Sequence, residues 1–489
     1  MAALTQVPVA PASPGRFRAL VGEDYAAVEQ AASTAGQLLA GRVVWHINST
    51  ARGGGVAELL QSLLAYARGA GVDVRWLTIG GNPDFFRITK RIHNRLHASD
   101  GDGGELGPAE RKIYERTLLE AADELVELVR DGDIVYIHDP QPAGLVPHVK
   151  SAGTKIVWRC HVGVDHPNGR AREAWDFLRP YIEDADALVF SRREFVWEGL
   201  ESERIWLVPP SIDAFSPKNE ELDPQAVRSI LNVIGLGEGD HFRQAVFVRE
   251  DGSTARVDRA AELDQEGPIP GEAPLIVQVS RWDRLKDPVG VLRCFAEHVA
   301  NPAAHLLLAG PSAAGVADDP EGAEVLAEVR GVLEQLPPEV RGRVHLACLP
   351  LDDVQENAAM VNAIQRGADV VVQKSLAEGF GLTVAEAMWK SKPVVASRVG
   401  GIQDQIVDGE SGVLIDDPAD LAAVGAAINA LLEDPDRAQA IGASARERVR
   451  RSFLGTRHLV QYMQLIEQML RSDGQDGQSD SGAQLQPPD

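Results

Sequence analysis

The chain has 489 residues, 44% of them hydrophobic, and carries a formal net charge of −24 with a pI near 4.9. This length exceeds what one core usually supports, so we expect two domains. The acidic balance argues against a general nucleic-acid or anionic-membrane surface, because both partners need a basic face. Three scattered cysteines argue against a disulfide framework or a thiolate metal site, and no apolar run reaches the length of a membrane span. We therefore predict a cytoplasmic protein.

The N-terminal region predicts a strand, a glycine loop and a helix in sequence. Residues 1–20 contain three prolines and are predicted to be disordered, and residues 23–39 have the pattern of an amphipathic helix. An apolar run at 42–48 then leads into a triple glycine, where Gly54 and Gly55 allow close backbone approach to a ligand. The glycines lack dinucleotide-binding spacing, so no nicotinamide site is predicted.

Strand-like and helical runs alternate along the rest of the chain, which predicts two doubly wound parallel sheets. The first domain is predicted at 21–210 and the second at 211–455, with a hinge at Pro209–Asp213. Within the second, residues 235–273 are glycine-rich and acidic, and are predicted to be an irregular, partly mobile insertion. A helix at 456–471 is predicted to cross back to the first domain, before a disordered acidic tail at 472–489.

Ligands of open parallel sheets bind beyond the carboxyl ends of the strands, so residues just after the predicted strands are the candidates. In the first domain these include His138, Asp139 and His161, although a single histidine at such a place is more often structural. In the second domain Arg281 and Lys286 follow a strand and are favoured as a clamp for a diphosphate, since both supply donors and positive charge. Two such edges facing each other predict a cleft that closes on a ligand.

A second strand, glycine loop and helix occupy residues 370–390. Gly379 and Gly381 leave the backbone accessible, and the free amides at the start of the predicted helix can hold phosphate or sugar oxygens. Two carboxylates, Glu378 and Glu386, bracket the loop eight residues apart. They could also be the acid and nucleophile of a glycosidase, but a simple glycosidase has no diphosphate that would need the basic clamp.

These motifs resemble the retaining glycosyltransferases of the glycogen-synthase-like and sucrose-synthase-like group, family 4, which have the two-domain GT-B fold. The similarity is closest to the trehalose glycosyltransferring synthases and extends over about residues 42–471. The stretches that carry it are His46–Leu60, His138–Pro142, Trp158–His161, Val208–Asp213, Val279–Asp283 and Glu378–Lys390.

The resemblance implies an α/β protein with two Rossmann-like domains that transfers glucose reversibly from a nucleoside-diphosphate (NDP) glucose to glucose, giving α,α-trehalose with retained configuration. It implies no cofactor besides this substrate, stimulation by Mg²⁺, and a homodimer. The resemblance also implies the roles of individual residues. On the donor side, Arg281 and Lys286 hold the diphosphate with Gly54 and Gly55 opposite, Glu386 holds the ribose, and the donor is also bound by Glu378, Gly379, Phe380, Gly381, Leu382 and Thr383. His161 lies near the transferred sugar, and His138 and Asp139 lie on the acceptor side.

Three departures from the family pattern stand out, namely the insertion at 235–273, the acidic tail, and Lys374 with Ala377 near the loop. Two alternatives remain open. One is a retaining trehalose phosphorylase, which uses inorganic phosphate in place of the nucleotide, and the other is a non-catalytic sugar-nucleotide sensor. The preferred nucleobase is not determined by the sequence, because base contacts in this fold are expected from backbone groups near Cys348–Pro350.

Overall fold

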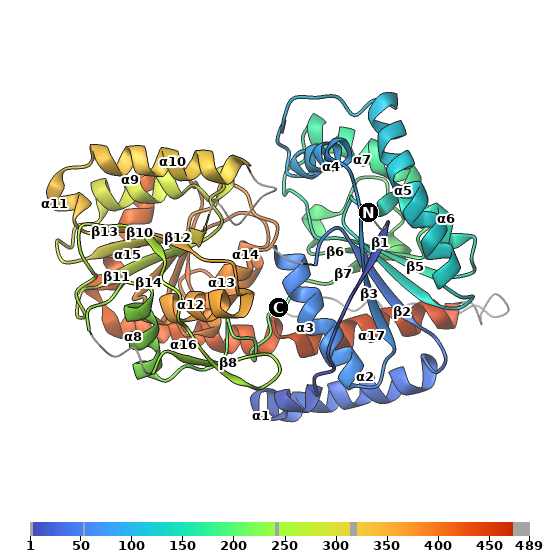
Figure 1. The fold of residues 1–489 in the computed structure, drawn as a ribbon, viewed down its shortest axis with the longest axis horizontal. Helices are drawn as coiled ribbons and strands as arrows, with labels where there is room; N and C mark the ends of the chain where they lie inside the picture. Colours follow the sequence, from blue (N-terminus) through green and yellow to red (C-terminus); the bar gives the residue numbers. More distant parts are fainter. Residues whose placement is uncertain (1–2, 52–53, 240–243, 313–319, 473–489) are drawn as a thin grey trace.

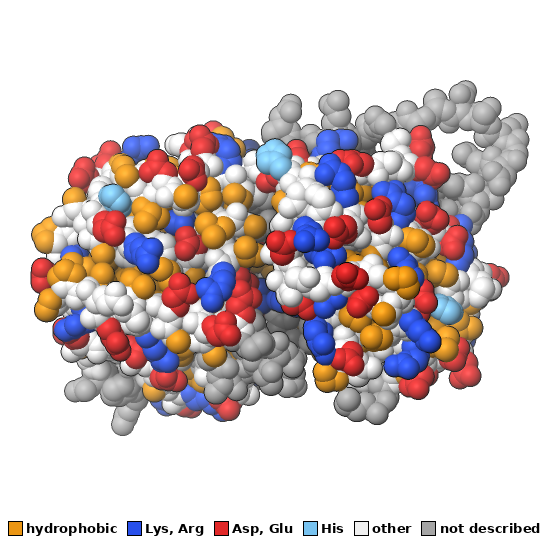
Figure 2. All heavy atoms as spheres, turned by 90° about the horizontal axis from the view of Figure 1, so that it is seen from above, with side chains coloured by type: hydrophobic (Ala, Val, Ile, Leu, Met, Phe, Trp, Pro, Cys, Tyr) orange, Lys and Arg blue, Asp and Glu red, His pale blue; other side chains and the backbone are white. Residues whose placement is uncertain are grey.

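The computed structural model describes residues 3–51, 54–239, 244–312 and 320–472, and within them the chain forms two α/β domains (Figure 1). Each contains a seven-stranded sheet, in the strand orders β1-β3-β2-β4-β5-β6-β7 and β10-β13-β12-β11-β14-β15-β16. Seen from above, the two lobes meet along a narrow seam (Figure 2). Among the described residues no helix has the length and apolar character needed to cross a membrane.

The first sheet is parallel except for its edge strand β1, which pairs antiparallel with β3. One face packs against α2, α3 and α17, and the other against α4, α5, α6 and α7. The elements are β1 (Leu4–Val7), α1 (Arg18–Val21), α2 (Tyr25–Leu38), β2 (Val44–Asn48), α3 (Gly55–Gly69), β3 (Val74–Ile79), α4 (Pro83–Leu96), α5 (Pro108–Leu128), β4 (Ile134–His138), α6 (Val146–Lys150), β5 (Lys155–Cys160), α7 (Gly169–Ile182), β6 (Ala187–Phe190) and β7 (Ile205–Leu207).

The second sheet repeats this plan, with antiparallel β10 at its edge. Helices α8, α12, α13 and α16 cover one face, and α9, α10 and α15 the other. The elements are α8 (Pro224–Val233), β8 (Val246–Val248), β9 (Thr254–Arg256), β10 (Glu262–Asp264), β11 (Leu275–Val279), α9 (Pro288–His298), β12 (His305–Pro311), α10 (Pro320–Gln335), α11 (Pro338–Arg341), β13 (Val344–Leu349), α12 (Val354–Gly367), β14 (Val370–Gln373), α13 (Leu382–Trp389), β15 (Val394–Ser397), α14 (Ile402–Gln405), β16 (Val413–Ile415), α15 (Leu421–Glu433), α16 (Pro435–Ser452) and α17 (Gly455–Ser472).

Two segments join the domains side by side. The predicted hinge pairs with the junction of α16 and α17, where the Ile212 N–H donates to the Phe453 carbonyl oxygen at 2.8 Å. Arg457 also donates to the carbonyl oxygens of Pro209 and Pro210. From this junction α17, red in Figure 1, crosses back and packs on α2 and α3, in agreement with the predicted crossing helix.

Two sequence predictions are wrong for the described residues. The N-terminal segment is ordered, because the backbone of β1 extends the first sheet and Phe17 is buried against Tyr66. The insertion is not irregular, because it contains the β8–β9 hairpin and β10. The predicted disordered tail lies outside the described residues, apart from Ser472 at the end of α17.

Candidate functional site

The carboxyl edge of the second sheet brings the predicted diphosphate clamp to the glutamate loop. Lys286 lies in a 3₁₀ turn after β11, and its Nζ atom contacts the Glu378 carboxylate in an ion pair. Glu378 follows β14, and the hydroxyl of Ser375 donates to the same carboxylate at 3.4 Å. Arg281 follows β11 directly; its guanidinium is 3.1 Å from Asp283, and half of its side chain is exposed. The edge therefore combines two positive charges with the carboxylate of Glu378.

The glycine loop is held from behind by neighbouring backbone. Gly381 has a φ of 84° and precedes the first turn of α13, a left-handed geometry that favours glycine. The Gly401 N–H donates to the Gly379 carbonyl oxygen at 3.1 Å, and Gln405 donates to the carbonyl oxygen of Phe380. These contacts use carbonyl groups of the loop and leave its amides out.

The two domains touch at the glycine loops. A Cβ atom added at Gly55 would lie 2.8 Å from a methyl carbon of Leu382, and one added at Gly379 would lie 3.2 Å from the His161 carbonyl oxygen. Gly54 has a φ of 91° and precedes α3. The structure thus brings Gly55 of the first domain against Leu382, the first residue of α13, and Gly379 against His161.

His161 is fixed by Asp139. The His161 N–H donates to Asp139 Oδ1 at 2.7 Å, and the ring Nδ1 lies 3.2 Å from Oδ2. Asp139 has a φ of 66°, a strained conformation for a residue other than glycine. Burial lowers the pKa of His161, an effect that the Asp139 carboxylate opposes. The ring is therefore oriented by a buried carboxylate.

His138 is placed differently from the prediction. It is fully buried, its Nε2 lies 3.0 Å from the Nδ1 of His46, and its ring stacks behind His161. A direct contact with an acceptor sugar is not supported at this position. Burial lowers the pKa of His46 to about 3 and lowers that of His138 as well, so both rings are neutral near pH 7.

Two further histidines at the site were missed by the sequence analysis. His93 lies on α4 and His97 is the C-cap residue of that helix, four residues later. Their rings are 5.1 Å apart, and neither Nδ1 has a hydrogen-bond partner among the described residues. His97 lies close to Gly379, and the charges of Glu378 and Lys286 act on its pKa. The charges of Asp139 and Arg281 act on the pKa of His93. Burial lowers their pKa values, to about 3 for His93 and about 4 for His97. The spacing of four on an amphipathic helix was the signal available.

Glu386 lies in a buried charge network that also joins the domains. Its Oε1 is 3.6 Å from the Nζ of Lys218, which is 2.7 Å from the Glu58 carboxylate on α3. Its Oε2 is buried and has no hydrogen-bond partner within the described part of the chain. Burial raises the pKa of Glu386, and Lys218 opposes this. Lys390 lies behind, hydrogen-bonded to Asn219, and burial lowers its pKa to about 7. The buried Oε2 atom keeps the capacity to accept a hydrogen bond.

On the flank of the site, Arg192 of the first domain fastens the second. It pairs with Asp165 at 2.6 Å and with Asp404 at 3.1 Å, and also donates to the Gly400 carbonyl oxygen at 2.5 Å. The Gly400 N–H in turn donates to Asp165 at 2.9 Å. Burial raises the pKa of Asp404 to about 6, although Arg192 acts in the opposite direction. These four residues fix the relative position of the two edges.

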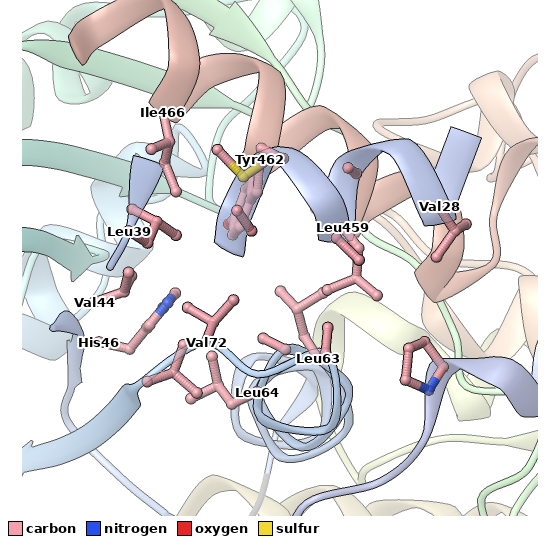
Figure 3. Close-up of a pocket in the computed structure, with 18 of the residues that line it drawn as sticks. Val28, Leu39, Val44, His46, Leu63, Leu64, Val72, Leu459, Tyr462 and Ile466 are labelled. Carbon is pink, nitrogen blue, oxygen red and sulfur yellow. The ribbon is translucent and has the colours of Figure 1, made fainter. Parts of the chain in front are cut away.

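A separate cavity of about 80 Å³ lies between α2, α3, α17 and the first sheet (Figure 3). Its walls are apolar side chains such as Leu63, Val72 and Ile466, and a ring nitrogen of His46 points toward the open space. It offers no cation for a phosphate, so it does not belong to the site described above. No group of three His, Cys, Asp or Glu side chains that could bind a metal ion occurs among the described residues.

Residues 46–197 match the family described as trehalose synthase, N-terminal domain, and residues 260–448 match glycosyl transferases group 1. A trehalose synthase of Rubrobacter xylanophilus is 38% identical over 442 residues, covering 89% of this chain and 92% of that protein. The chain belongs to the trehalose synthase family. It is accordingly a hexosyltransferase with two Rossmann-like domains.

Two further proteins are similar to this chain at lower sequence identity. A trehalose phosphorylase of Pleurotus sajor-caju is 28% identical over 398 residues, covering 75% of this chain but only 50% of that protein. The solved structure of a sucrose-phosphate synthase from Thermosynechococcus elongatus has a TM-score of 0.60 and 19% identity, covering 88% of this chain and all of that chain. The second similarity establishes the GT-B arrangement of the domains.

Proposed function

We propose that this protein forms α,α-trehalose reversibly from an NDP-glucose and glucose, with retention of configuration. The observation that carries the proposal is the contact between Lys286 and Glu378 at the edge of the second sheet, opposite His161. A cation for the leaving diphosphate and a carboxylate for sugar hydroxyls are adjacent there. Family membership supports trehalose as the product.

In the proposed reaction the bond between glucose C1 and the diphosphate oxygen breaks, and a bond from C1 to the anomeric oxygen of the acceptor forms on the same face. The acceptor hydroxyl proton passes to the leaving phosphate oxygen, so no protein nucleophile is needed. Arg281 and Lys286 stabilise the charge that develops on the diphosphate. Glu378 and the amides of Gly379–Thr383 hold the transferred glucose, and Glu386 accepts hydrogen bonds from the ribose hydroxyls. Catalysis is then mainly positioning.

The acceptor glucose is assigned to the first domain. The Nδ1 atoms of His93 and His97, which have no partner among the described residues, supply neutral hydrogen-bonding groups there, and the ring of His161 is held beside them by Asp139 and Arg159. His138 supports His161 from behind. We propose no cofactor, and Mg²⁺ would act through the diphosphate.

The reaction is tested by incubating the purified protein with trehalose and either a nucleoside diphosphate or inorganic phosphate, then identifying the sugar product by chromatography. NDP-glucose supports the proposal. Glucose 1-phosphate would make the protein a phosphorylase, and free glucose alone would indicate hydrolysis. The absence of any product would contradict trehalose as the substrate and favour a sensor.

A further inference from the structure

Lys374, one of the residues near the glutamate loop that depart from the family pattern, forms a buried ion pair. It directly follows β14, its side chain is only 2% exposed, and its Nζ atom contacts the Asp287 carboxylate. A buried ammonium group is costly unless a carboxylate compensates its charge, so the pair constrains both side chains strongly. Because Asp287 balances this charge, Lys374 adds little positive charge of its own to the diphosphate clamp.

Asp287 directly follows Lys286, and both of its carboxylate oxygens have partners. Oδ1 accepts a hydrogen bond from the Gly290 N–H at 2.9 Å and caps helix α9, whereas Oδ2 contacts Lys374. The backbone of Asp287 has a φ of 49°, a left-handed conformation that is uncommon for a residue other than glycine. The two side-chain contacts therefore stabilise an unusual backbone conformation immediately after Lys286.

The two residues after this buried lysine contact the clamp as well. The N–H of Leu376 donates to the Leu285 carbonyl oxygen at 2.7 Å, inside the 3₁₀ turn that ends at Lys286. The hydroxyl of Ser375 donates to the Glu378 carboxylate at 3.4 Å. The segment that follows β14 therefore holds the turn of the cation and the carboxylate of its partner at the same time.

We propose that Lys374 is a positioning residue for the diphosphate clamp, because through Asp287 it sets the place of the Lys286 ammonium group; this role rests on the proposed function. Without Lys374, the Asp287 carboxylate loses its cation and becomes an alternative partner for the adjacent Lys286, at the expense of the pair with Glu378. An ammonium group displaced by about 1 Å stabilises the leaving diphosphate much less, since catalysis of this kind depends on positioning.

A double-mutant cycle separates this indirect role from direct binding of the donor. Lys374→Met removes the charge but fills the space, and should lower kcat/KM for ADP-glucose or UDP-glucose by about tenfold or more. The KM for glucose should change little. In a Lys286→Met background the same substitution should cost no more than about twofold, because the group that it positions is already absent. Two residues that acted independently on the diphosphate would give losses that multiply.

Asp287→Asn tests the same ion pair from its other side. Asparagine is a good N-cap residue and tolerates the left-handed conformation, so α9 keeps its cap while Lys374 loses its carboxylate. This variant should lower kcat/KM for the donor as Lys374→Met does, and the two substitutions together should cost about as much as one. It also tests the inference if Lys374→Met does not fold.

Lys155→Met is the matched control. It removes a lysine that pairs with Asp186 at 3.4 Å, at the beginning of β5 in the first domain. Its kcat/KM should match that of the unaltered protein. Thermal unfolding of each variant checks that the assay temperature lies well below its melting temperature.

An unchanged kcat/KM for the donor in Lys374→Met, or losses that multiply in the Lys286→Met background, would overturn the inference. If neither NDP-glucose yields trehalose with the unaltered protein, the proposed function fails. The calorimetric Kd of ADP and UDP in the same cycle then decides the inference, because Lys374→Met should weaken nucleotide binding only where Lys286 is present. A protein that binds neither nucleotide would contradict both.

Discussion

The Nζ atom of Lys286 contacts the Oε2 atom of Glu378, so the two groups proposed to hold the leaving diphosphate and the glucose hydroxyls neutralise each other when no donor is bound. A donor that enters between them must replace this contact with its own oxygens and hydroxyls. The ion pair therefore compensates two largely buried charges.

Replacing Lys286 by Met should lower kcat/KM for the NDP-glucose by about a hundredfold or more, because a charge that stabilises the leaving diphosphate is lost. Arg281→Ala and Glu378→Ala should abolish synthesis in the same assay. Arg284→Met is the matched control, since Arg284 lies in the same turn but pairs with Glu328 on the surface. Steady-state kinetics decide the matter. Near-normal activity of Lys286→Met would remove this residue from the clamp.

Replacing Lys218 by Met should raise the KM for the donor more than it lowers kcat. Without this cation the pKa of the buried Glu386 rises further, and a protonated carboxyl loses acceptor capacity toward the ribose. Because the lost carboxylate returns as pH rises, the KM of the variant should fall with increasing pH. A KM that matches the unaltered protein at every pH would show that Lys218 does not sustain Glu386. Glu58→Gln, which leaves Lys218 in place, should have a smaller effect.

Replacing His97 or His93 by Ala should raise the KM for glucose about tenfold, the loss of one well-placed hydrogen bond, with little change in the KM for the donor. The pKa is about 3 for His93 and about 4 for His97, so both rings are neutral above pH 5.5. The KM of the unaltered protein for glucose should therefore not change between pH 5.5 and pH 8. Measurements in the synthesis direction with varied glucose provide the test. A rise in the donor KM alone would place these rings on the donor side instead.

Replacing Asp404 by Asn should increase the melting temperature more at pH 8 than at pH 5. The pKa of Asp404 is raised to about 6 in the folded protein, from 3.8, so the favourable contribution of its neutral form is lost as pH rises through this range. Asn resembles the neutral form. Arg192 keeps Asp165 and Glu194 as partners, and Glu194, Asp165 and Arg448 are the other charges facing Asp404. Since about a third of the side chain is exposed, the effect should be modest. Thermal unfolding that shows a larger gain at pH 5 would reverse the assigned sign.

The alternating pattern of the sequence predicted both sheets and the crossing helix because buried parallel strands are long apolar runs. It did not predict β1, whose four residues include Thr5 and Gln6 and are stabilised by backbone pairing with β3. The three-residue strands of the insertion were missed because they are too short to show an alternating pattern, although Phe247 beside them is buried in the core of the second domain.

At the candidate site too, some residues could be predicted from the sequence pattern and others could not. Glu378, Lys286 and the glycine loops stand at predictable places, directly after strands or at the start of a helix. Lys218 and Arg192 could not be singled out, because their partners Glu386 and Asp404 lie far along the chain and only the folded structure joins them. His138 was misplaced because a strand end does not reveal that the ring is covered by His46 and His161.

Helix α17 imposes an order on biosynthesis. Its side chains Tyr462, Met463 and Leu465 complete the apolar layer under a sheet whose strands are made in the first 210 residues. During translation that face stays uncovered until residues 455–472 have left the ribosome, so the first domain cannot finish folding while the second is being made. A nascent chain stopped before residue 455 should bind chaperones and be degraded readily, and the two halves should not be separable into independently stable fragments.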